Sequence, residues 1–543
     1  MLVNQNLDKV IKKHFSRLSR QSLYAGLSAF VVGLIAHLFI LTNEFANHDD
    51  IRDLWRAGYR ISATRWLQSI CSPLVSLWGS GLMAGLFTLI ILTVSAILLV
   101  DTFKIKSYTM SCIVGAMMSA SPIVACFMSY PNGSYQFAVG IPFAILAFRL
   151  YDKGIKGFIG ASLALMFAIA GYQSNICITI ACLYVLLFSR LFEESFDIKK
   201  WWKDFGRAFA MLVCGLVLYI ISLVIMGKIT GSADYSFGVT GANLESHGYA
   251  AQTETGTLYV SNIVETVKTS IKYFVKYHFN VLFDGANVSL ASHVNTFANI
   301  FIAIGLCLVV LFALIRQKGF IRKVMIIAVA VFAPMCINST EIILNGKCHE
   351  TLQMMYSMVI SVPLVVVLTE KTTLIQDKLK NSIITVCFMM LILHLYGNIQ
   401  IINDAYQRMN SAYETAFSEM TRIMYTVEQT DEWQAGCRSL YFDYGENEGY
   451  LINENYQAMT LRDDYIDMGW MGIFGTGVYP FWCDENTANF AKCYLGVVFD
   501  TPTNEEIEKI KESPEYDTLE KYPSKNAVKV INGVVVVRMD WQE

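Results

Sequence analysis

The sequence predicts a mainly α-helical, polytopic membrane protein with a small α/β region at its C-terminal end. Of its 543 residues, 54% are hydrophobic and only 16% are charged, and the mean hydropathy is +0.42. Soluble domains carry about 25% charged residues, so this composition favours a chain that crosses a membrane several times. The net charge of −3 gives no reason to expect a nucleic-acid partner.

The N-terminal residues 1–22 are basic with apolar positions between the charges, which predicts an amphipathic segment on the cytoplasmic surface. Residues 23–400 contain about eleven apolar runs and form the predicted transmembrane domain, although several runs are shorter than the roughly 20 residues of a full crossing. The runs are 23–42, 79–100, 108–128, 137–151, 158–170, 175–188, 209–226, 297–315, 324–337, 352–368 and 383–396.

The stretch 158–188 is interrupted by the polar residues 171–174, so it is either one long helix or two short ones. With two spans, all the lysine and arginine clusters between the predicted spans, from Lys104 to Lys380, fall on the cytoplasmic side. With one span, the last three of these clusters would face outward. We therefore predict two spans. The polar break then lies on the outer side, where irregular backbone has to line a cavity.

Residues 401–543 are predicted to form an extracytoplasmic helix followed by a small α/β domain. Apolar residues over 402–424 recur at helical spacing. A buried strand is expected over 494–499, and Thr503 with Glu506 forms a capping box that begins a short helix. Asn532-Gly533 between two β-rich runs predicts a hairpin.

The long outer loop, 228–293, contains apolar residues at helical spacing between Val260 and Val275, with Lys268, Lys272 and Lys276 on another face. This pattern predicts a helix lying along the membrane interface.

Asp49 and Asp50 follow the first apolar run, on the predicted outer side. Carboxylates at the mouth of a membrane helix are costly, so a functional role is the first hypothesis. Such a carboxylate can take the proton of an attacking hydroxyl, and two close carboxylates titrate as a pair, so either is the base. The alternative is that one of them caps the helix that follows. One cap does not require two acids, and we predict that Asp49 or Asp50 is catalytic.

The first outer loop also supplies predicted substrate-binding residues. Arg65 is expected to bind a phosphate, with an arginine that extends to the membrane surface as the alternative. Arg52 lies on a stripe with Arg56 and Arg60. This stripe indicates either that Arg52 contacts the lipid-linked sugar donor or that the arginines form a solvated helix face. Trp66 is expected to face a sugar or lipid, against the alternative of an ordinary interface tryptophan.

Two further outer segments complete the predicted site. Gln173 in the polar break is expected to bind the sugar. The alternative is that its amide only makes the hydrogen bonds that the polar break between two short helices requires. In the segment 338–351, Lys347 is a second phosphate ligand or an exposed lysine, and His349 and Glu350 belong to the site or to a hydrated helix start. A divalent cation between carboxylates such as Asp49, Asp50 and Glu350 is conceivable. No ligand spacing demands one, so we predict neither a metal nor another cofactor.

Asp49-Asp50 followed by Thr64-Arg65-Trp66 resembles the bacterial type II glucosyl transferase family of O-antigen and cell-wall glycan modification. The resemblance covers roughly residues 23–396, and Thr64 stands where the family usually has glycine. It implies a GT-C-like polytopic glycosyltransferase of the bacterial plasma membrane. The implied donor is a polyprenyl-phosphate hexose such as undecaprenyl phosphate glucose, and the implied acceptor is a surface polysaccharide. The segment 521–524 is similar to tails of Gram-positive members.

The alternative function is a flippase or transporter for a lipid-linked sugar. Transporters often show matching halves with broken helices and midplane charges, whereas here the acids cluster at one face and no half-repeat is apparent. A third hypothesis is a glycan-binding scaffold, in which the tail binds and neither aspartate matters. We predict the transferase.

Overall fold

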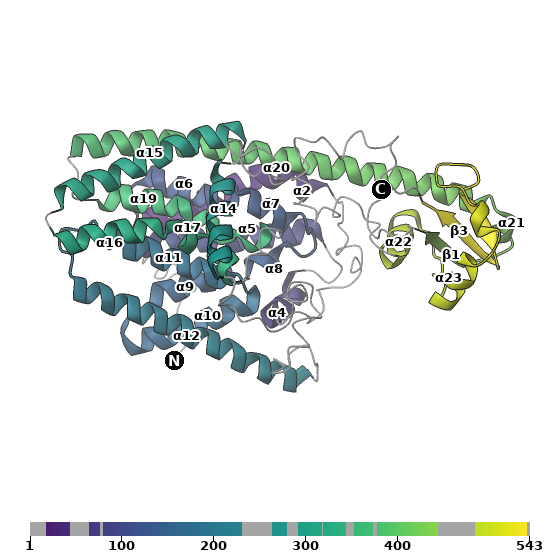
Figure 1. The fold of residues 1–543 in the computed structure, drawn as a ribbon, viewed down its shortest axis with the longest axis horizontal. Helices are drawn as coiled ribbons and strands as arrows, with labels where there is room; N and C mark the ends of the chain where they lie inside the picture. The colour runs from purple at the N-terminus through teal and green to yellow at the C-terminus, as the bar shows by residue number, and fades with distance from the viewer. Residues whose placement is uncertain are drawn as a thin grey trace, which may run out of the picture.

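The computed structural model describes residues 18–43, 65–75, 80–230, 263–279, 292–317, 319–343, 352–372, 377–443 and 484–539. The protein is mainly α-helical, with one small sheet near the C-terminal end (Figure 1). Within the described residues, six helices are long and apolar enough to cross a membrane. They are α2 (Arg20–Thr42), α5 (Gly81–Phe103), α10 (Gly154–Gly171), α12 (Ile198–Thr230), α15 (His293–Arg316) and α20 (Asp377–Glu428).

The remaining apolar runs form shorter or broken helices. One pair, α6 (Tyr108–Ser119) and α7 (Pro122–Met128), is bent by 41° and counts as a seventh candidate span. The bend falls where Ser121 caps α7 and Pro122 occupies its first turn, a position that proline tolerates because no helical donor is lost there. The others are α8 (Ser134–Ala138), α9 (Ile141–Leu150), α11 (Asn175–Arg190), α16 (Phe320–Val331), α17 (Ala333–Ile337), α18 (Ser339–Ile343) and α19 (Ser361–Lys371).

The apolar run 352–368 is not one helix. Two 3₁₀ segments, η5 (Leu352–Met354) and η6 (Tyr356–Ile360), precede α19. Tertiary hydrogen bonds hold the tighter turns: the Tyr356 hydroxyl donates to the Met118 carbonyl at 2.6 Å, and the Ser357 hydroxyl donates to the Ile337 carbonyl at 2.7 Å. These contacts outweigh the local tendency of the run to continue as an α-helix.

His37 lies fully buried inside the bundle and joins α2 to two other helices. Its Nδ1 lies 2.6 Å from the Tyr406 hydroxyl on α20, and its Nε2 lies 2.8 Å from the Ser119 carbonyl at the end of α6. A carbonyl only accepts, so Nε2 donates to Ser119 and Nδ1 accepts the Tyr406 proton. His37 is therefore a packed residue with both ring nitrogens hydrogen-bonded.

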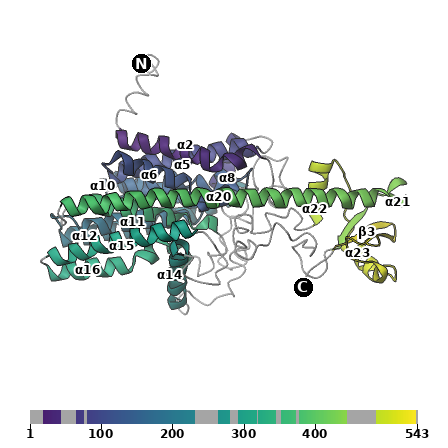
Figure 2. The same cartoon turned by 90° about the horizontal axis from the view of Figure 1, so that it is seen from above.

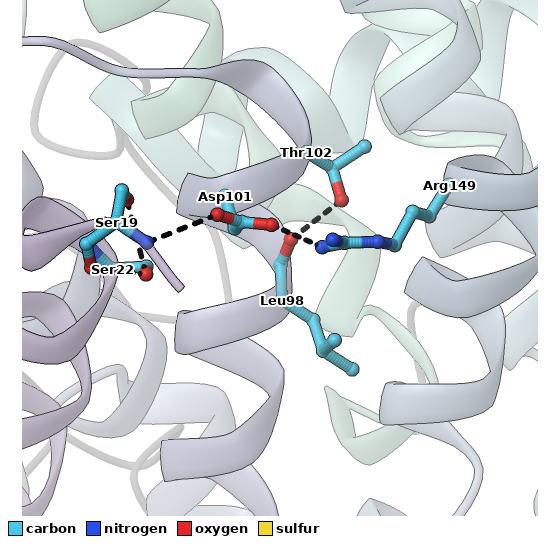
Figure 3. Close-up of polar contacts among 6 residues, drawn as sticks. All are labelled: Ser19, Ser22, Leu98, Asp101, Thr102 and Arg149. Carbon is cyan, nitrogen blue, oxygen red and sulfur yellow. Dashed lines mark hydrogen bonds and ion pairs between the residues drawn. The ribbon is translucent and has the colours of Figure 1, made fainter. Parts of the chain in front are cut away.

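Ion pairs and hydrogen bonds connect the chain at the end of the bundle where α2 and α20 begin. Asp101 Oδ2 lies 2.6 Å from Arg149 Nη1, and Asp101 Oδ1 accepts the Ser19 backbone N–H at 3.4 Å (Figure 3). The Glu370 carboxylate accepts the Lys106 backbone N–H at 2.9 Å. Further contacts at this end are Arg190 with Asp204, Arg207 with the Asp152 carbonyl, Arg322 with the Leu191 carbonyl, and Lys380 with the Glu370 carbonyl. The basic clusters used to predict the topology thus gather at one end.

The helix predicted within the long outer loop is α14 (Ile263–Phe279), which runs across the direction of α20 (Figure 2). Its buried side chains include Thr266, Ser270 and Tyr277, whereas Val264 is 65% exposed. Ile271 of the predicted apolar stripe is 38% exposed, and Lys268 and Lys272 on the predicted charged face are exposed as well. The position of α14 along the membrane interface stays a prediction.

At the C-terminal end, α20 continues past residue 400 without a break and leads to a three-stranded sheet (Figure 1). The strands are β1 (Leu440–Asp443), β2 (Val528–Ile531) and β3 (Val534–Arg538), in the order β1-β3-β2. β2 pairs antiparallel with β3, and β1 pairs parallel with it. The predicted hairpin is confirmed: Asn532 and Gly533 have φ angles of 51° and 80°, as a type I′ turn requires.

The capping box is also confirmed, because the Glu506 carboxylate accepts the Thr503 backbone N–H at 2.8 Å at the start of α23 (Asn504–Lys511). The strand predicted over 494–499 is wrong. α22 (Asp484–Phe490) passes into a π-helical turn over Ala491–Leu495, and Gly496 follows with a φ of 70°. Val498 is 59% exposed, so this run is not a buried strand. The third strand of the sheet is instead β1.

Candidate active site

The polar break between α10 and α11 is the centre of the candidate site. The two helices are separate, as predicted, with Tyr172 in an extended conformation at the junction. Gly171 lets the end of α10 approach α9, because a Cβ there would lie 2.9 Å from the backbone N and Cα of Gly140. The Tyr172 ring packs edge-on against Phe137, with 5.3 Å between centroids. Close helix packing therefore fixes the backbone of the break.

Arg65 is held by two residues of this break. Its Nε donates to Gln173 Oε1 at 2.8 Å, and its Cζ lies 4.3 Å from the centroid of the Tyr172 ring. A guanidinium carries five N–H donors. Among the described residues, Gln173 alone accepts a hydrogen bond from Arg65, and it does so at Nε rather than at the Nη donors. The structure thus brings together two of the predicted substrate-binding residues, Arg65 and Gln173.

The helix α4 (Trp66–Val75) positions Arg65, which directly precedes it. Gln68 Nε2 donates to the Gly171 carbonyl at 2.7 Å and to the Gln136 carbonyl at 3.1 Å, which ties α4 to the ends of α10 and α8. Trp66 Nε1 donates to the Ser222 hydroxyl on α12 at 3.0 Å. Trp66 is only 7% exposed, so its contacts in the structure anchor α4. A role for Trp66 in binding substrate stays a prediction.

The N-terminus of α11 adds a second source of positive potential next to Arg65. Gln173 directly precedes the N-cap residue Ser174, and Ser174 makes no side-chain cap. A helix N-terminus carries about half a positive charge and presents backbone N–H groups. The Cys177 side chain, in the first turn of α11, lies beside Ser339 and Thr340 of α18. The buried Ser339 hydroxyl therefore provides a further polar group near this helix end.

Segments from other parts of the chain pack around this region. Ser270 on α14 and Asn338 form a reciprocal pair, with the Ser270 hydroxyl donating to the Asn338 carbonyl at 2.9 Å and Asn338 Nδ2 donating to the Ser270 carbonyl at 3.0 Å. Asn338 is fully buried and leads into α18. The beginning of the predicted third outer segment is therefore folded into the protein rather than forming a free loop.

The other predicted site residues, Asp49, Asp50, Arg52, Lys347, His349 and Glu350, lie outside the described residues. The neighbouring described residues show where their segments begin and end. The acidic loop leaves α2 at Thr42 and returns at Arg65 in the candidate site, and the third outer segment leaves α18 at Ile343. Within the described residues, no cluster of three or more His, Cys, Asp or Glu side chains is arranged to hold a metal.

Gln68, Ser222 and Ser339 were not predicted from the sequence. Gln68 belongs to a short stretch that contains Pro73 and was not among the apolar runs, while Ser222 lies inside a long apolar run. A single polar residue in such a run gives no signal of its partner, because the partner comes from a distant segment. Only the packing of α4 across α8, α10 and α12 reveals these contacts.

Substituting Gly171 tests whether close packing of α9 and α10 holds the break. We expect Gly171→Ala to lower the stability of the folded protein by about 1–3 kcal/mol, because the added Cβ overlaps the Gly140 backbone and cannot rotate away. Thermal unfolding of the protein in detergent measures this change.

Gly206→Ala is the matched control, because this helical glycine has no atom within 4 Å of the added Cβ. It should instead gain roughly 0.5–1 kcal/mol from reduced backbone freedom. Equal melting temperatures for the two variants would contradict the packing account.

A comparison with known protein families identifies a family model that matches this chain. The family described as glucosyl transferase GtrII matches residues 38–368. The match begins within α2 and ends in α19, so it spans the acidic loop, α4 and the polar break. No match was found among curated proteins.

Proposed function

The chain belongs to the glucosyl transferase GtrII family, and from this membership we propose a membrane glycosyltransferase that uses a polyprenyl-phosphate hexose. The proposed sugar is glucose, and the proposed acceptor is a hydroxyl of a cell-surface polysaccharide on the outer face of a bacterial plasma membrane. The observation that carries the donor class is Arg65, held on Tyr172 and Gln173 beside the N-terminus of α11. Two sources of positive potential together favour an anionic group such as a phosphate.

In the proposed reaction, Asp49 or Asp50 takes the proton of the acceptor hydroxyl as its oxygen attacks the anomeric carbon. The bond between that carbon and the phosphate oxygen breaks, and the electron pair leaves with the polyprenyl phosphate. The Arg65 guanidinium and the α11 N-terminus stabilise the negative charge that develops on this oxygen. A phosphate leaves readily, so no strong general acid is required. Gln173 orients Arg65 through the hydrogen bond at Nε.

We further propose the orientation in the membrane. The bundle end with the basic clusters faces the cytoplasm, in agreement with the positive-inside rule. The candidate site and the C-terminal sheet then face outward. In this arrangement, which we propose to be GT-C-like, the bent and broken segments also count as crossings, which gives about eleven. The segment 1–22 remains cytoplasmic, and the residues beyond 400 form an outer region.

The direct test is a transfer assay with purified full-length protein. Polyprenyl-phosphate glucose labelled in the sugar is mixed with surface polysaccharide, and both products are measured. We expect labelled polysaccharide and polyprenyl phosphate to appear in equal amounts, and only when both substrates are present. Movement of the intact labelled lipid across a vesicle membrane, without release of polyprenyl phosphate, would instead support the flippase.

A further inference from the structure

We propose that the outer region contains a second binding site, a groove that holds an anionic glycan chain at a distance from the site of transfer. This inference rests on the proposed function, because it assigns to the groove a more distant part of the same acceptor. The groove has a volume of about 520 Å³ and lies between the last turns of α20 and the turn that precedes β2. It is lined by Thr421, Arg422, Tyr425, Thr426 and residues 522–525.

The floor and walls of the groove are built by packed residues. Tyr522 is buried and belongs to the same apolar cluster as Ile423 and Met424 of α20. The Tyr522 backbone N–H donates to the Arg538 carbonyl at 2.8 Å, and the Ser524 N–H donates to the Lys521 carbonyl at 3.0 Å. The turn is therefore fixed to both the sheet and the helix, and the groove has a defined shape.

The groove presents groups that suit a sugar. The Tyr425 ring is 65% exposed and offers an apolar face with a polar hydroxyl at its end. Thr421, Thr426 and Ser524 add hydroxyl oxygens that can accept hydrogen bonds along the groove. Their protons are donated to the Phe417 carbonyl, the Arg422 carbonyl and the Glu520 carboxylate. Its volume of about 520 Å³ falls in the range of about 300–1,000 Å³ of pockets that hold small ligands.

The charges favour an anionic chain. Arg422 and Lys525 are exposed and line the groove, and none of the lining residues that the structure describes is acidic. The neighbouring Glu520 carboxylate accepts a hydrogen bond from the Ser524 hydroxyl. Cationic side chains of this kind bind the phosphate or carboxylate groups of a glycan through charge-assisted hydrogen bonds.

The position of the groove favours the acceptor over the donor. α20 is one continuous helix from the bundle to the groove, and at about 1.5 Å per residue it carries Tyr425 roughly 28 Å beyond Tyr406. Tyr406 is buried in the bundle against His37. A lipid-linked sugar stays at the membrane surface, whereas a polysaccharide is long enough to reach both sites at once. Holding the chain in the groove raises its effective concentration at the site of transfer.

The test measures binding to full-length protein with three probes: a fluorescent oligosaccharide with phosphodiester links, the same oligosaccharide without phosphate, and vesicles containing an anionic phospholipid. We expect the charged oligosaccharide to bind, and Tyr425→Ala and Lys525→Gln each to weaken its Kd about tenfold. Lys511→Gln removes the same charge from exposed α23 and should bind like wild type. If Tyr425→Ala lowers the melting temperature, the binding of the charged oligosaccharide to the Lys525→Gln variant alone decides the proposal.

Several outcomes would overturn the inference. They are equal binding of the charged and neutral oligosaccharides, charged binding that neither variant weakens, and vesicle binding that depends on Tyr425 and Lys525 in place of glycan binding. Catalysis is measured separately: Tyr425→Ala should raise the KM for the polysaccharide and leave kcat on a short hexoside acceptor unchanged. If wild-type protein transfers sugar to no acceptor, the proposed function fails. The binding measurements then still decide whether the groove binds an anionic glycan.

Discussion

Replacing both Asp49 and Asp50 by Asn should reduce sugar transfer to the background rate, while the protein is still produced and inserted. Asparagine keeps the size of the side chain but cannot take a proton from the acceptor hydroxyl. A positioned general base contributes about 10²- to 10⁴-fold, so at least one single variant should lose that much in kcat. The two acids titrate as a pair if they interact strongly, and the single variants show which of them is needed.

Asp53→Asn is the matched control, because Asp53 follows in the same loop but is not part of the acidic pair. Transfer, protein level and melting temperature are measured for all four variants. If the pair only caps a helix, Asn caps it about as well as Asp, so the melting temperature and the transfer rate both stay near the wild-type values. A double variant that transfers sugar at the wild-type rate therefore rejects catalysis by either residue.

Those features of the fold that depend on local patterns could be predicted from the sequence. The Asn532-Gly533 turn, the capping box at Thr503 and the separation of α10 from α11 follow from residues close in the chain, and the structure contains all three. The apolar run 494–499 failed as a strand because a strand requires a neighbour to pair with. β1 pairs with β3 instead, and only tertiary pairing decides whether β1 or the run 494–499 joins the sheet.

The candidate site shows the same division. The Arg-Trp sequence and the polar break each predicted a substrate-binding residue, and the structure joins these two residues, Arg65 and Gln173, by a hydrogen bond. The two residues lie 108 positions apart in the chain, so no local pattern could establish their contact. Gln68 is as important for the geometry as either of them, because it ties α4 to two helix ends. Its sequence context gives no sign of this role.

Removing the guanidinium of Arg65 should have the second large effect on transfer. We expect Arg65→Ala to lower kcat about 10²- to 10³-fold, the usual loss when one preorganised donor to a developing anion is removed. Arg65→Lys keeps the charge but cannot reproduce both the Nε bond to Gln173 and the planar contact with Tyr172. It should fall between wild type and Arg65→Ala. Single-turnover transfer at saturating donor measures kcat apart from donor binding.

Gln173→Ala separates positioning from direct contact. It removes the acceptor at Nε but leaves the guanidinium present, so the lost activity should be smaller than for Arg65→Ala. Arg207→Ala serves as the control, because Arg207 lies at the opposite end of the bundle. Its one acceptor among the described residues is the Asp152 carbonyl at 3.3 Å. If Arg65 simply extended to the membrane surface, Arg65→Ala would behave like Arg207→Ala and leave kcat unchanged. A strong loss of kcat at Arg65 alone places the leaving phosphate beside the polar break.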